Sequence, residues 1–325
     1  MLDRIKNYLG KDWTDTIELI HSSLKSDIVL LDMTNSSILS SGGKMLRPVM
    51  SLLVARACSG GRTTADSIRF AAASELLHNA TLLHDDVADE SRERRGRPTV
   101  MSLLGGPASV LIGDFWLVRA MENILASEQG DEVIRIFAKT LSDLAEGEML
   151  QLQKAGSCDT VEEDYLRIIY SKTASLFEAS GVAAAKSVHA SVTFVEAVRE
   201  YCICLGMAFQ IKDDMLDYSD GEALGKPVGS DLEEGKITLP LLGALGNADE
   251  AEAARIRELV KAVSDHPENK AEVRDFVMTC GGMEYSSMKL DEFVKKAVIA
   301  LEALPESEEK DYLAKLASFT AWRKR

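Results

Sequence analysis

Two short runs of aspartate carry the chemistry that this sequence can do. Residues Asp85–Asp89 read DDVAD and residues Asp213–Asp217 read DDMLD, so each is a DDxxD motif. Both lie in segments with helical periodicity, where residues four apart project from one face with about 5–6 Å between their Cβ atoms. Clustered carboxylates suit hard cations, and Mg²⁺ typically pairs one or two carboxylates with substrate phosphates. The two motifs therefore predict a site where Mg²⁺ ions hold a diphosphate.

The second motif extends into a longer polar stripe. Gln210, Asp213, Asp214 and Asp217 follow the spacing i, i+3, i+4, i+7 and share one helix face. A single DDxxD motif is commonly no more than a solvated acidic face, because short motifs match by chance. Two copies, each in an otherwise apolar helix, favour the metal–diphosphate interpretation over that alternative.

Basic residues flank these motifs in several places. Lys44 and Arg47 follow a glycine turn where a helix begins, and helix N-termini attract anions. Arg94 and Arg95 follow the first motif, and guanidinium groups match phosphate oxygens in bidentate fashion. The plainer alternatives are an ordinary helix start and arginines that offset the neighbouring aspartates, a role that we expect for Arg92 and Arg97.

Three lysines could also bind phosphate. Lys172 precedes Thr173 in an apolar helical stretch, where its alternative role is a harmless snorkelling side chain. Lys226 and Lys236 lie in a glycine-rich loop after the second motif, which alone reads as a plain surface loop.

The bulk composition limits the function classes. The 325 residues carry a net charge of −15, which argues against nucleic acid as a partner. Five scattered cysteines without a CxxC pair predict neither a disulfide framework nor a zinc site, and they fit a reducing cytoplasm. The first residues lack the apolar stretch of a signal peptide, and no uncharged apolar run reaches the roughly 18 residues of a membrane span.

Helical periodicity recurs almost throughout the chain, and no segment alternates as a strand would. We therefore predict one all-α domain over residues 1–325. The expected helices are Ile17–Leu31, Met50–Cys58, Ala65–Asp89, Val133–Lys154, Val161–Lys186, Thr193–Asp217, Ala251–Ser264 and Glu284–Leu304. The expected loops are Ser40–Gly43, Ser59–Arg62, Gly96–Pro98, Gly105–Pro107 and Gly221–Gly235.

Taken together and in order, these motifs resemble the trans-isoprenyl diphosphate synthases, which include farnesyl, geranylgeranyl and longer polyprenyl diphosphate synthases. The resemblance covers about Gly42 to Pro240. The stretch GGKMLRP at Gly42–Pro48 is similar to the family's GGKxxRP. LHDDVADE at Leu83–Glu90, followed by RRGRPT, and FQIKDDMLD at Phe209–Asp217 resemble its two aspartate-rich regions. The resemblance implies a helical bundle of the isoprenoid-synthase type around a central cavity.

The resemblance also implies roles for individual residues. Mg²⁺, three ions with substrate bound, would be held by Asp85, Asp89 and Asp213 with support from Asp86, Asp214 and Asp217. The allylic diphosphate would be bound by Arg94, Lys172, Lys226 and Lys236. The diphosphate of isopentenyl diphosphate would be bound by Lys44, Arg47, His78 and Arg95, with Arg323–Arg325 close by. Thr173 and Gln210 would line the reacting centre. A satisfied core histidine remains the alternative for His78.

The implied reaction joins isopentenyl diphosphate head-to-tail to an allylic prenyl diphosphate by ionisation, condensation and elimination. In such enzymes bulky residues one or two turns before the first motif form a floor that limits the product. Those positions hold Ala80 and Thr81, then Leu77 and Ser74, and the deeper candidates for a floor are Phe115, Trp116 and Met121. We therefore expect a medium- or long-chain polyprenyl diphosphate, with geranylgeranyl or farnesyl diphosphate as alternative products.

Other readings have specific weaknesses. A terpene cyclase would share the first motif but would normally carry a different second one. A non-catalytic regulatory subunit of a heteromeric synthase would have lost aspartates, and none is lost here. A structural bundle that binds divalent ions would not explain the basic clusters. The resemblance further implies a homodimer, and we expect the product to pass to membrane enzymes.

Overall fold

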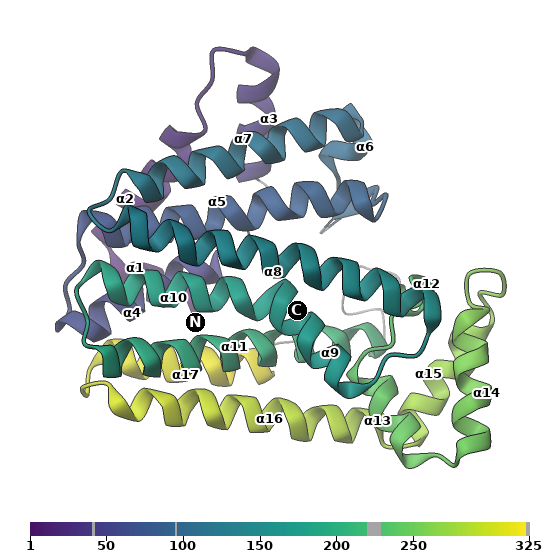
Figure 1. The fold of residues 1–325 in the computed structure, drawn as a ribbon. Coiled ribbons are helices and arrows are strands. Elements are labelled where there is room, and N and C mark those ends of the chain that lie inside the picture. Colours follow the sequence, from purple (N-terminus) through teal and green to yellow (C-terminus); the bar gives the residue numbers. More distant parts are fainter. Residues whose placement is uncertain (41–42, 95, 220–228, 323–325) are drawn as a thin grey trace. The chain divides into compact units, whose positions relative to one another are not determined.

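The computed structural model describes the chain except residues 41–42, 95, 220–228 and 323–325. In the described ranges helices dominate, and the strands are the two-residue pair β1 (Glu93–Arg94) and β2 (Arg97–Pro98), which run antiparallel (Figure 1). The helices are α1 (Leu2–Leu9), α2 (Lys11–Ser23), α3 (Val29–Ser40), α4 (Leu46–Ser59), α5 (Ala65–Ala88), α6 (Val100–Leu104), α7 (Gly106–Leu125), α8 (Gly130–Ser157), α9 (Glu162–Ile169), the π-helix η1 (Tyr170–Ala174), α10 (Ser175–Ser187), α11 (Val192–Tyr218), α12 (Ser230–Glu233), α13 (Leu239–Asn247), α14 (Glu250–Lys261), α15 (Asn269–Thr279), α16 (Gly282–Ala300), the 3₁₀ turn η3 (Leu301–Ala303) and α17 (Glu308–Trp322). The predicted all-α class is confirmed.

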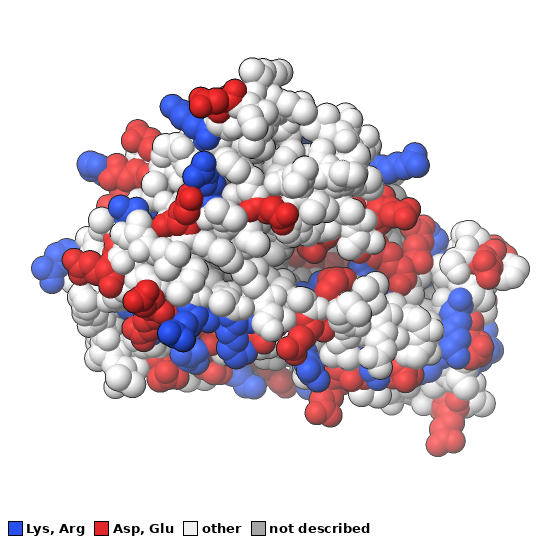
Figure 2. All heavy atoms as spheres, turned by 45° about the horizontal axis from the view of Figure 1, so that its top comes forward, with Lys and Arg blue, Asp and Glu red and all other residues white. Residues whose placement is uncertain are grey.

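The surface carries charges of both signs. Acidic and basic side chains are interspersed over the face drawn in Figure 2, with white uncharged areas between them. Many of these charges are paired within one helix, as Lys11 is with Asp15 and Lys261 with Glu258. Such exposed pairs contribute little to stability. The net negative charge is therefore a property of the surface, and the fold does not depend on it.

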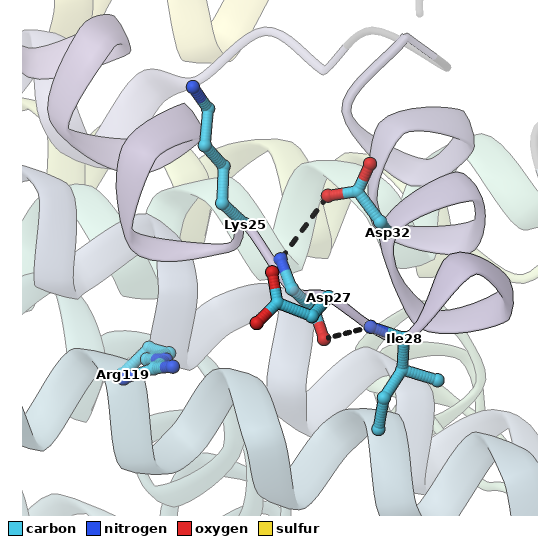
Figure 3. Close-up of a pocket in the computed structure, with 6 residues that line it drawn as sticks. Lys25, Asp27, Ile28, Asp32 and Arg119 are labelled. Atoms are coloured by element: carbon cyan, nitrogen blue, oxygen red, sulfur yellow. Dashed lines mark hydrogen bonds between the residues drawn. The ribbon is translucent and has the colours of Figure 1, made fainter.

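The expected helix Ile17–Leu31 is wrong, because the chain breaks between α2 and α3. Side chains bind the backbone there and compete with helical bonds. The Ser26 N–H donates to Oδ1 of Asp32 at 3.3 Å, and the Ile28 N–H donates to Oγ of Ser26 at 3.1 Å (Figure 3). The Asn35 amide donates to the Leu24 carbonyl at 2.8 Å, which satisfies the end of α2.

Other departures concern helices that the pattern did not indicate. The chain forms α7 over Gly106–Leu125, beginning with a proline in its first turn, where the missing N–H costs nothing. The stretch expected as one helix over Val161–Lys186 is divided into α9, η1 and α10.

None of the helices described is both long and apolar enough to cross a membrane.

The chain divides into two compact units, which we describe separately: unit 1 comprises Met1–Lys139, Glu178–Arg199 and Leu301–Leu313, and unit 2 comprises Thr140–Phe177, Glu200–Ala300 and Ala314–Arg325. The single domain over residues 1–325 stays a prediction. In unit 1 the helix α5 packs against α2, α4 and α7 and lies beside α7 along its length (Figure 1). A capping box between Thr64 and Ser67 fixes its start, and Ser67 also bonds Ser187 on α10 at 2.6 Å.

In unit 2 the π-helix η1 is held by two close approaches. A Cβ atom built on Gly206 of α11 would lie 2.5 Å from Cα of Ala174. One built on Gly147 of α8 would lie 2.5 Å from Cβ of Ser171. Glycine at both positions therefore lets α8 and α11 approach η1 at distances that no side chain would permit. This packing sets the position of residues 172 and 173.

We expect Gly206→Ala to lower the free energy of unfolding by about 1–3 kcal/mol, because the added methyl overpacks the contact with Ala174. The matched control is Gly156→Ala on α8, where an added Cβ meets open space. That control should stabilise the helix by up to about 1 kcal/mol. Urea unfolding followed by circular dichroism measures both, and equal changes in the two variants would contradict the packing argument.

Candidate active site

The first aspartate motif lies at the C-terminal end of α5. The helix ends at Ala88, and Asp89 is its cap, with its N–H donating to the Asp85 carbonyl at 2.8 Å. This bond keeps Asp85 and Asp89 one turn apart, as the spacing predicts. Asp85 is half-buried and Asp89 is exposed, so both carboxylates lie near solvent.

Asp86 has a different environment from its neighbours. Its carboxylate is 4% exposed and accepts a hydrogen bond from Nε of Arg94 at 2.8 Å. Burial raises the pKa of the Asp86 carboxyl, and the Arg94 guanidinium opposes that rise. The β1–β2 turn carries Arg94 back onto the helix. Arg94 thus offsets Asp86, and the same role for Arg92 and Arg97 stays a prediction.

A cavity of about 120 Å³ lies beside this pair in unit 1. His78, Asp86, Arg94 and Arg97 all line it, together with the buried Glu75. The structure therefore brings His78, expected at one diphosphate, next to Arg94, expected at the other. Glu75 was not predicted; its place three residues before His78 on the same helix face was the available signal.

Lys44 and Arg47 flank the start of α4. Met45 takes a left-handed conformation with φ 50° immediately before the helix begins at Leu46. Lys44 is exposed, whereas Arg47 is only 9% exposed and extends into the unit. Arg95, Lys226 and Arg323–Arg325 lie outside the described residues, so their expected roles stay predictions.

In unit 2 the stripe on α11 is tied together by hydrogen bonds. Nε2 of Gln210 donates to Oδ1 of Asp214 at 2.8 Å, and the Tyr165 hydroxyl on α9 donates to Oδ2 at 2.7 Å. Burial raises the pKa of the Asp214 carboxyl to about 7, although both hydrogen bonds act to lower it. Asp213, next to it, is half-buried. Tyr165 was missed by the sequence analysis, because nothing in its local pattern indicates a partner 49 residues away.

Lys172 and Thr173 lie in the π-helix η1. Lys172 Nζ contacts Oε2 of Glu148 at 2.5 Å and donates to Oε1 of Gln151 at 3.0 Å. The Thr173 hydroxyl donates to Oε1 of Gln210 at 2.7 Å. Wide turns of this kind often occur at functional sites. The structure therefore brings Thr173 and Gln210 together, and it shows Glu148 and Gln151 as partners of Lys172.

Asp217 on α11 accepts hydrogen bonds from residues at the start of the short helix α12. Its Oδ1 accepts the Ser230 hydroxyl at 2.9 Å and the Ser230 N–H at 3.3 Å, and its Oδ2 accepts the Asp231 N–H at 3.1 Å. Burial raises the pKa of Asp231, and the nearby carboxylates add to the rise. Lys236, expected at the allylic diphosphate, forms an ion pair with Glu234.

The residues expected to limit product length lie in different surroundings. Leu77 and Ala80 are each 1% exposed, whereas Thr81 is half-buried and its hydroxyl donates to the His78 carbonyl at 2.9 Å. Trp116 is fully buried, and its indole N–H donates to Oδ1 of Asn35 at 2.8 Å. Phe115 lies under the Arg119 guanidinium, 4.8 Å from its ring centroid. Of the expected chain-length residues on α5, Leu77, Ala80 and Thr81, Thr81 is thus the one that keeps accessible surface.

Known proteins resemble this chain over nearly all its length. A family model described as polyprenyl synthetase matches residues 29–277. An octaprenyl diphosphate synthase of Haemophilus influenzae is 41% identical and covers 97% of this chain and 95% of its own. An all-trans-nonaprenyl-diphosphate synthase (geranyl-diphosphate specific) of Rhodobacter capsulatus is 37% identical and covers 95% of this chain and 94% of its own. The crystal structure of a polyprenyl synthase from Caulobacter crescentus, complexed with calcium and isoprenyl diphosphate, superposes with a TM-score of 0.91 at 34% identity and covers 100% of this chain and 98% of its own.

The chain belongs to the polyprenyl synthetase family. It is a polyprenyl diphosphate synthase, a transferase of prenyl groups, as the resemblance implied. The all-α fold and the family agree with the sequence-based predictions. The roles of the individual site residues follow from geometry and chemistry and are taken up below as proposals.

The donor set of the two motifs fits Mg²⁺, on which this family depends in general. Hard oxygen ligands are what Mg²⁺ prefers, and it keeps part of its shell for water and phosphate. Within the residues described, three acidic, histidine or cysteine side chains do not converge to form a complete metal cage.

Proposed function

We propose that this enzyme condenses isopentenyl diphosphate head-to-tail with an allylic prenyl diphosphate to give a medium- or long-chain polyprenyl diphosphate. The observation that carries the proposal is the pair of aspartate motifs, each at the end of a helix, together with basic side chains in each unit. Lys172 in unit 2 and the cavity lined by His78, Arg94 and Arg97 in unit 1 supply phosphate-binding chemistry. A cage for structural ions would not need these basic groups.

The chain's own residues each have a task in the proposed reaction. Asp85, Asp89 and Asp213 would hold Mg²⁺, with three ions in the substrate complex, and the bound metal would neutralise charge on the leaving diphosphate. Arg94 and Lys172, joined by Lys226 and Lys236, hold that same diphosphate through charge-assisted hydrogen bonds. Lys44, Arg47, His78 and Arg95 hold the diphosphate of isopentenyl diphosphate.

The reacting carbons need different surroundings from the diphosphates. As the allylic carbon–oxygen bond breaks, positive charge develops on carbon, and the double bond of isopentenyl diphosphate attacks it. The side-chain oxygens of Thr173 and Gln210 are held in place by their hydrogen bond and can face this positive charge. Polar groups that are oriented before the reaction lower its barrier. The attack leaves the positive charge on the tertiary carbon of the isopentenyl unit, and loss of a proton from the adjacent CH₂ group to the departed diphosphate forms the new double bond. Apolar walls keep water from the cation.

The product length is proposed from two lines of support. The relatives described above carry octaprenyl and nonaprenyl names. Before Asp85, the half-buried Thr81 is small, and no aromatic residue occupies the preceding two turns, Ser74–Leu83. One helical turn of about 5.4 Å is comparable with one isoprene unit, so these turns leave room for several units.

Asp85→Ala should abolish turnover, because it removes a proposed metal ligand beside the leaving diphosphate. The assay incubates the protein with isopentenyl diphosphate, several allylic primers and Mg²⁺, and mass spectrometry gives the product lengths. Asp291→Ala is the matched control, an exposed aspartate on α16 that should keep full activity. An inactive wild-type chain would instead support a non-catalytic subunit, and a cyclic hydrocarbon product would support a terpene cyclase.

Thr81→Phe should shorten the product by one or more isoprene units, because the ring fills the space beside the accessible face of α5. We prefer this variant to Ala80→Phe, since Ala80 is 1% exposed and a ring there would disturb packing. Thr193→Phe, at an exposed position at the start of α11, makes the same substitution away from the motifs. An unchanged product distribution for Thr81→Phe would refute this placement of the growing chain.

We further propose that the enzyme is a homodimer that pairs through α7. Leu111, Val118 and Leu125 are spaced by seven residues and are 68%, 51% and 55% exposed, so they form an apolar seam on one helix face. Leu103 on α6, 67% exposed, adds to the apolar surface of the same unit. Soluble monomers rarely expose contiguous apolar surface of this kind, and two-fold dimers are the commonest oligomers.

Leu111→Glu combined with Val118→Glu should convert the dimer to a monomer, because each copy would bury charges at the seam. Light scattering after size-exclusion chromatography measures the mass. The double control Val192→Glu and Ile299→Glu changes apolar residues that are 79% and 61% exposed on other helices, and it should remain dimeric. A monomeric wild-type protein would contradict the proposal.

The proposed location is the cytoplasm, with the product passed to membrane enzymes. The five cysteines support this location, because all are free thiols rather than disulfide partners.

A further inference from the structure

A continuous chain of hydrogen bonds in unit 2 leads from α9 to the π-helix. The Tyr165 hydroxyl donates to Oδ2 of Asp214 at 2.7 Å, and the Gln210 amide donates to Oδ1 of the same carboxylate at 2.8 Å. The Thr173 hydroxyl donates to Oε1 of Gln210 at 2.7 Å. Four side chains from α9, α11 and η1 are therefore linked end to end.

The chemistry of the groups fixes the direction of each bond. The Tyr165 hydroxyl donates to Oδ2 of Asp214, and Oδ1 accepts from Nε2 of Gln210, so the NH₂ side of the amide faces Asp214. The carbonyl side then faces Thr173, whose hydroxyl proton is used in that bond. The lone pairs of the Thr173 oxygen take no part in that bond. Without Asp214 the amide could turn over, and Thr173 would accept instead of donating.

Burial makes this arrangement specific. Tyr165, Asp214 and Thr173 are 3%, 5% and 8% exposed, so water competes little for these groups. Tyr165 lies in an apolar cluster with Ile169, Met207 and Ile211. In such surroundings a lost partner leaves a buried polar group unsatisfied, which is more costly than the mean value of a hydrogen bond. Each member of the chain therefore constrains the next.

We propose that Tyr165 and Asp214 are positioning residues that orient Gln210 and Thr173 toward the reacting carbon, and that Asp214 does this instead of holding Mg²⁺. The inference rests on the function proposed above and deepens it. Asp214 is 5% exposed and each of its oxygens accepts a hydrogen bond inside the protein, whereas the adjacent Asp213 is half-buried. This assignment differs from the expectation, based on the motif, that Asp214 supports the metal.

The first experiment compares Tyr165→Phe with Tyr285→Phe. Tyr285 also packs against the same apolar cluster and donates its hydroxyl to a carboxylate, Oε2 of Glu162 at 2.5 Å, but it is not part of the chain to Thr173. We expect kcat to fall about tenfold or more in Tyr165→Phe, the effect of one hydrogen bond to a charged group, with KM little changed. Tyr285→Phe should retain kcat. Equal kcat values in the two variants would overturn the inference.

The second experiment separates positioning from metal binding. Mg²⁺ activation curves are recorded for Asp213→Asn and Asp214→Asn, which remove one charge from adjacent residues. Asp213→Asn should require more Mg²⁺ for half-maximal activity. Asp214→Asn should lower kcat while the half-activating Mg²⁺ concentration stays at the wild-type value. A shift for Asp214→Asn as large as that for Asp213→Asn would make Asp214 a metal ligand and refute the proposal.

A third measurement does not depend on activity. Urea unfolding of Tyr165→Phe, Thr173→Val and the double variant forms a double-mutant cycle, in which residues of one network show non-additive changes. Additive changes would show that Tyr165 does not act on Thr173, whatever the enzyme catalyses. An inactive wild-type protein would refute the proposed function, whereas an active wild-type with an active Tyr165→Phe variant would refute only this inference.

Discussion

The structure depends on how closely spaced carboxylates can be buried next to one another. Like charges one turn apart on a helix repel, and the repulsion grows when water is excluded. Asp86, Asp214 and Asp217 each have internal partners. Asp86 has the Arg94 guanidinium, Asp214 has Tyr165 and Gln210, and Asp217 has Ser230 and the Asp231 N–H. The two motifs thus combine scaffold and function, with the first aspartate of each nearer to solvent than the second.

The π-helix η1 lies where two neighbouring helices each contact one of its side chains. Thr173 must reach Gln210 on α11 while Lys172 reaches Glu148 on α8. Consecutive side chains on a helix point about 100° apart, which lets Lys172 and Thr173 contact two neighbouring helices. Gly147 and Gly206 supply the space for the backbone of η1. At η1 the position of the backbone, its close packing and the contacts of its side chains therefore depend on one another.

Much of the fold and part of the site could be predicted because local sequence patterns indicate them. Periodicity and the DDxxD spacing located α5 and α11, and resemblance supplied the family. The break between α2 and α3 was missed because the bonds of Ser26 and Asn35 depend on side-chain geometry, which periodicity does not carry. The helix α7 was missed because apolar residues such as Leu111 and Val118 lie on its exposed face, which blurs the amphipathic signal. Tyr165 was missed because its partner is distant in sequence.

The remaining question is how a chain with a net charge of −15 holds anionic substrates. Its basic site residues are already engaged by acidic groups, as Lys172 is by Glu148 and Arg94 is by Asp86. A diphosphate at Lys172 therefore exchanges one anionic partner for another instead of meeting an unpaired cation. The exchange is favourable only if the incoming group brings its own positive charge, because Glu148 would otherwise be left beside a second anion. A diphosphate that carries Mg²⁺ meets this condition, since the ion can be shared with the aspartates of the motifs. The acidic character of the site thus favours the metal complex of the substrate over the free anion.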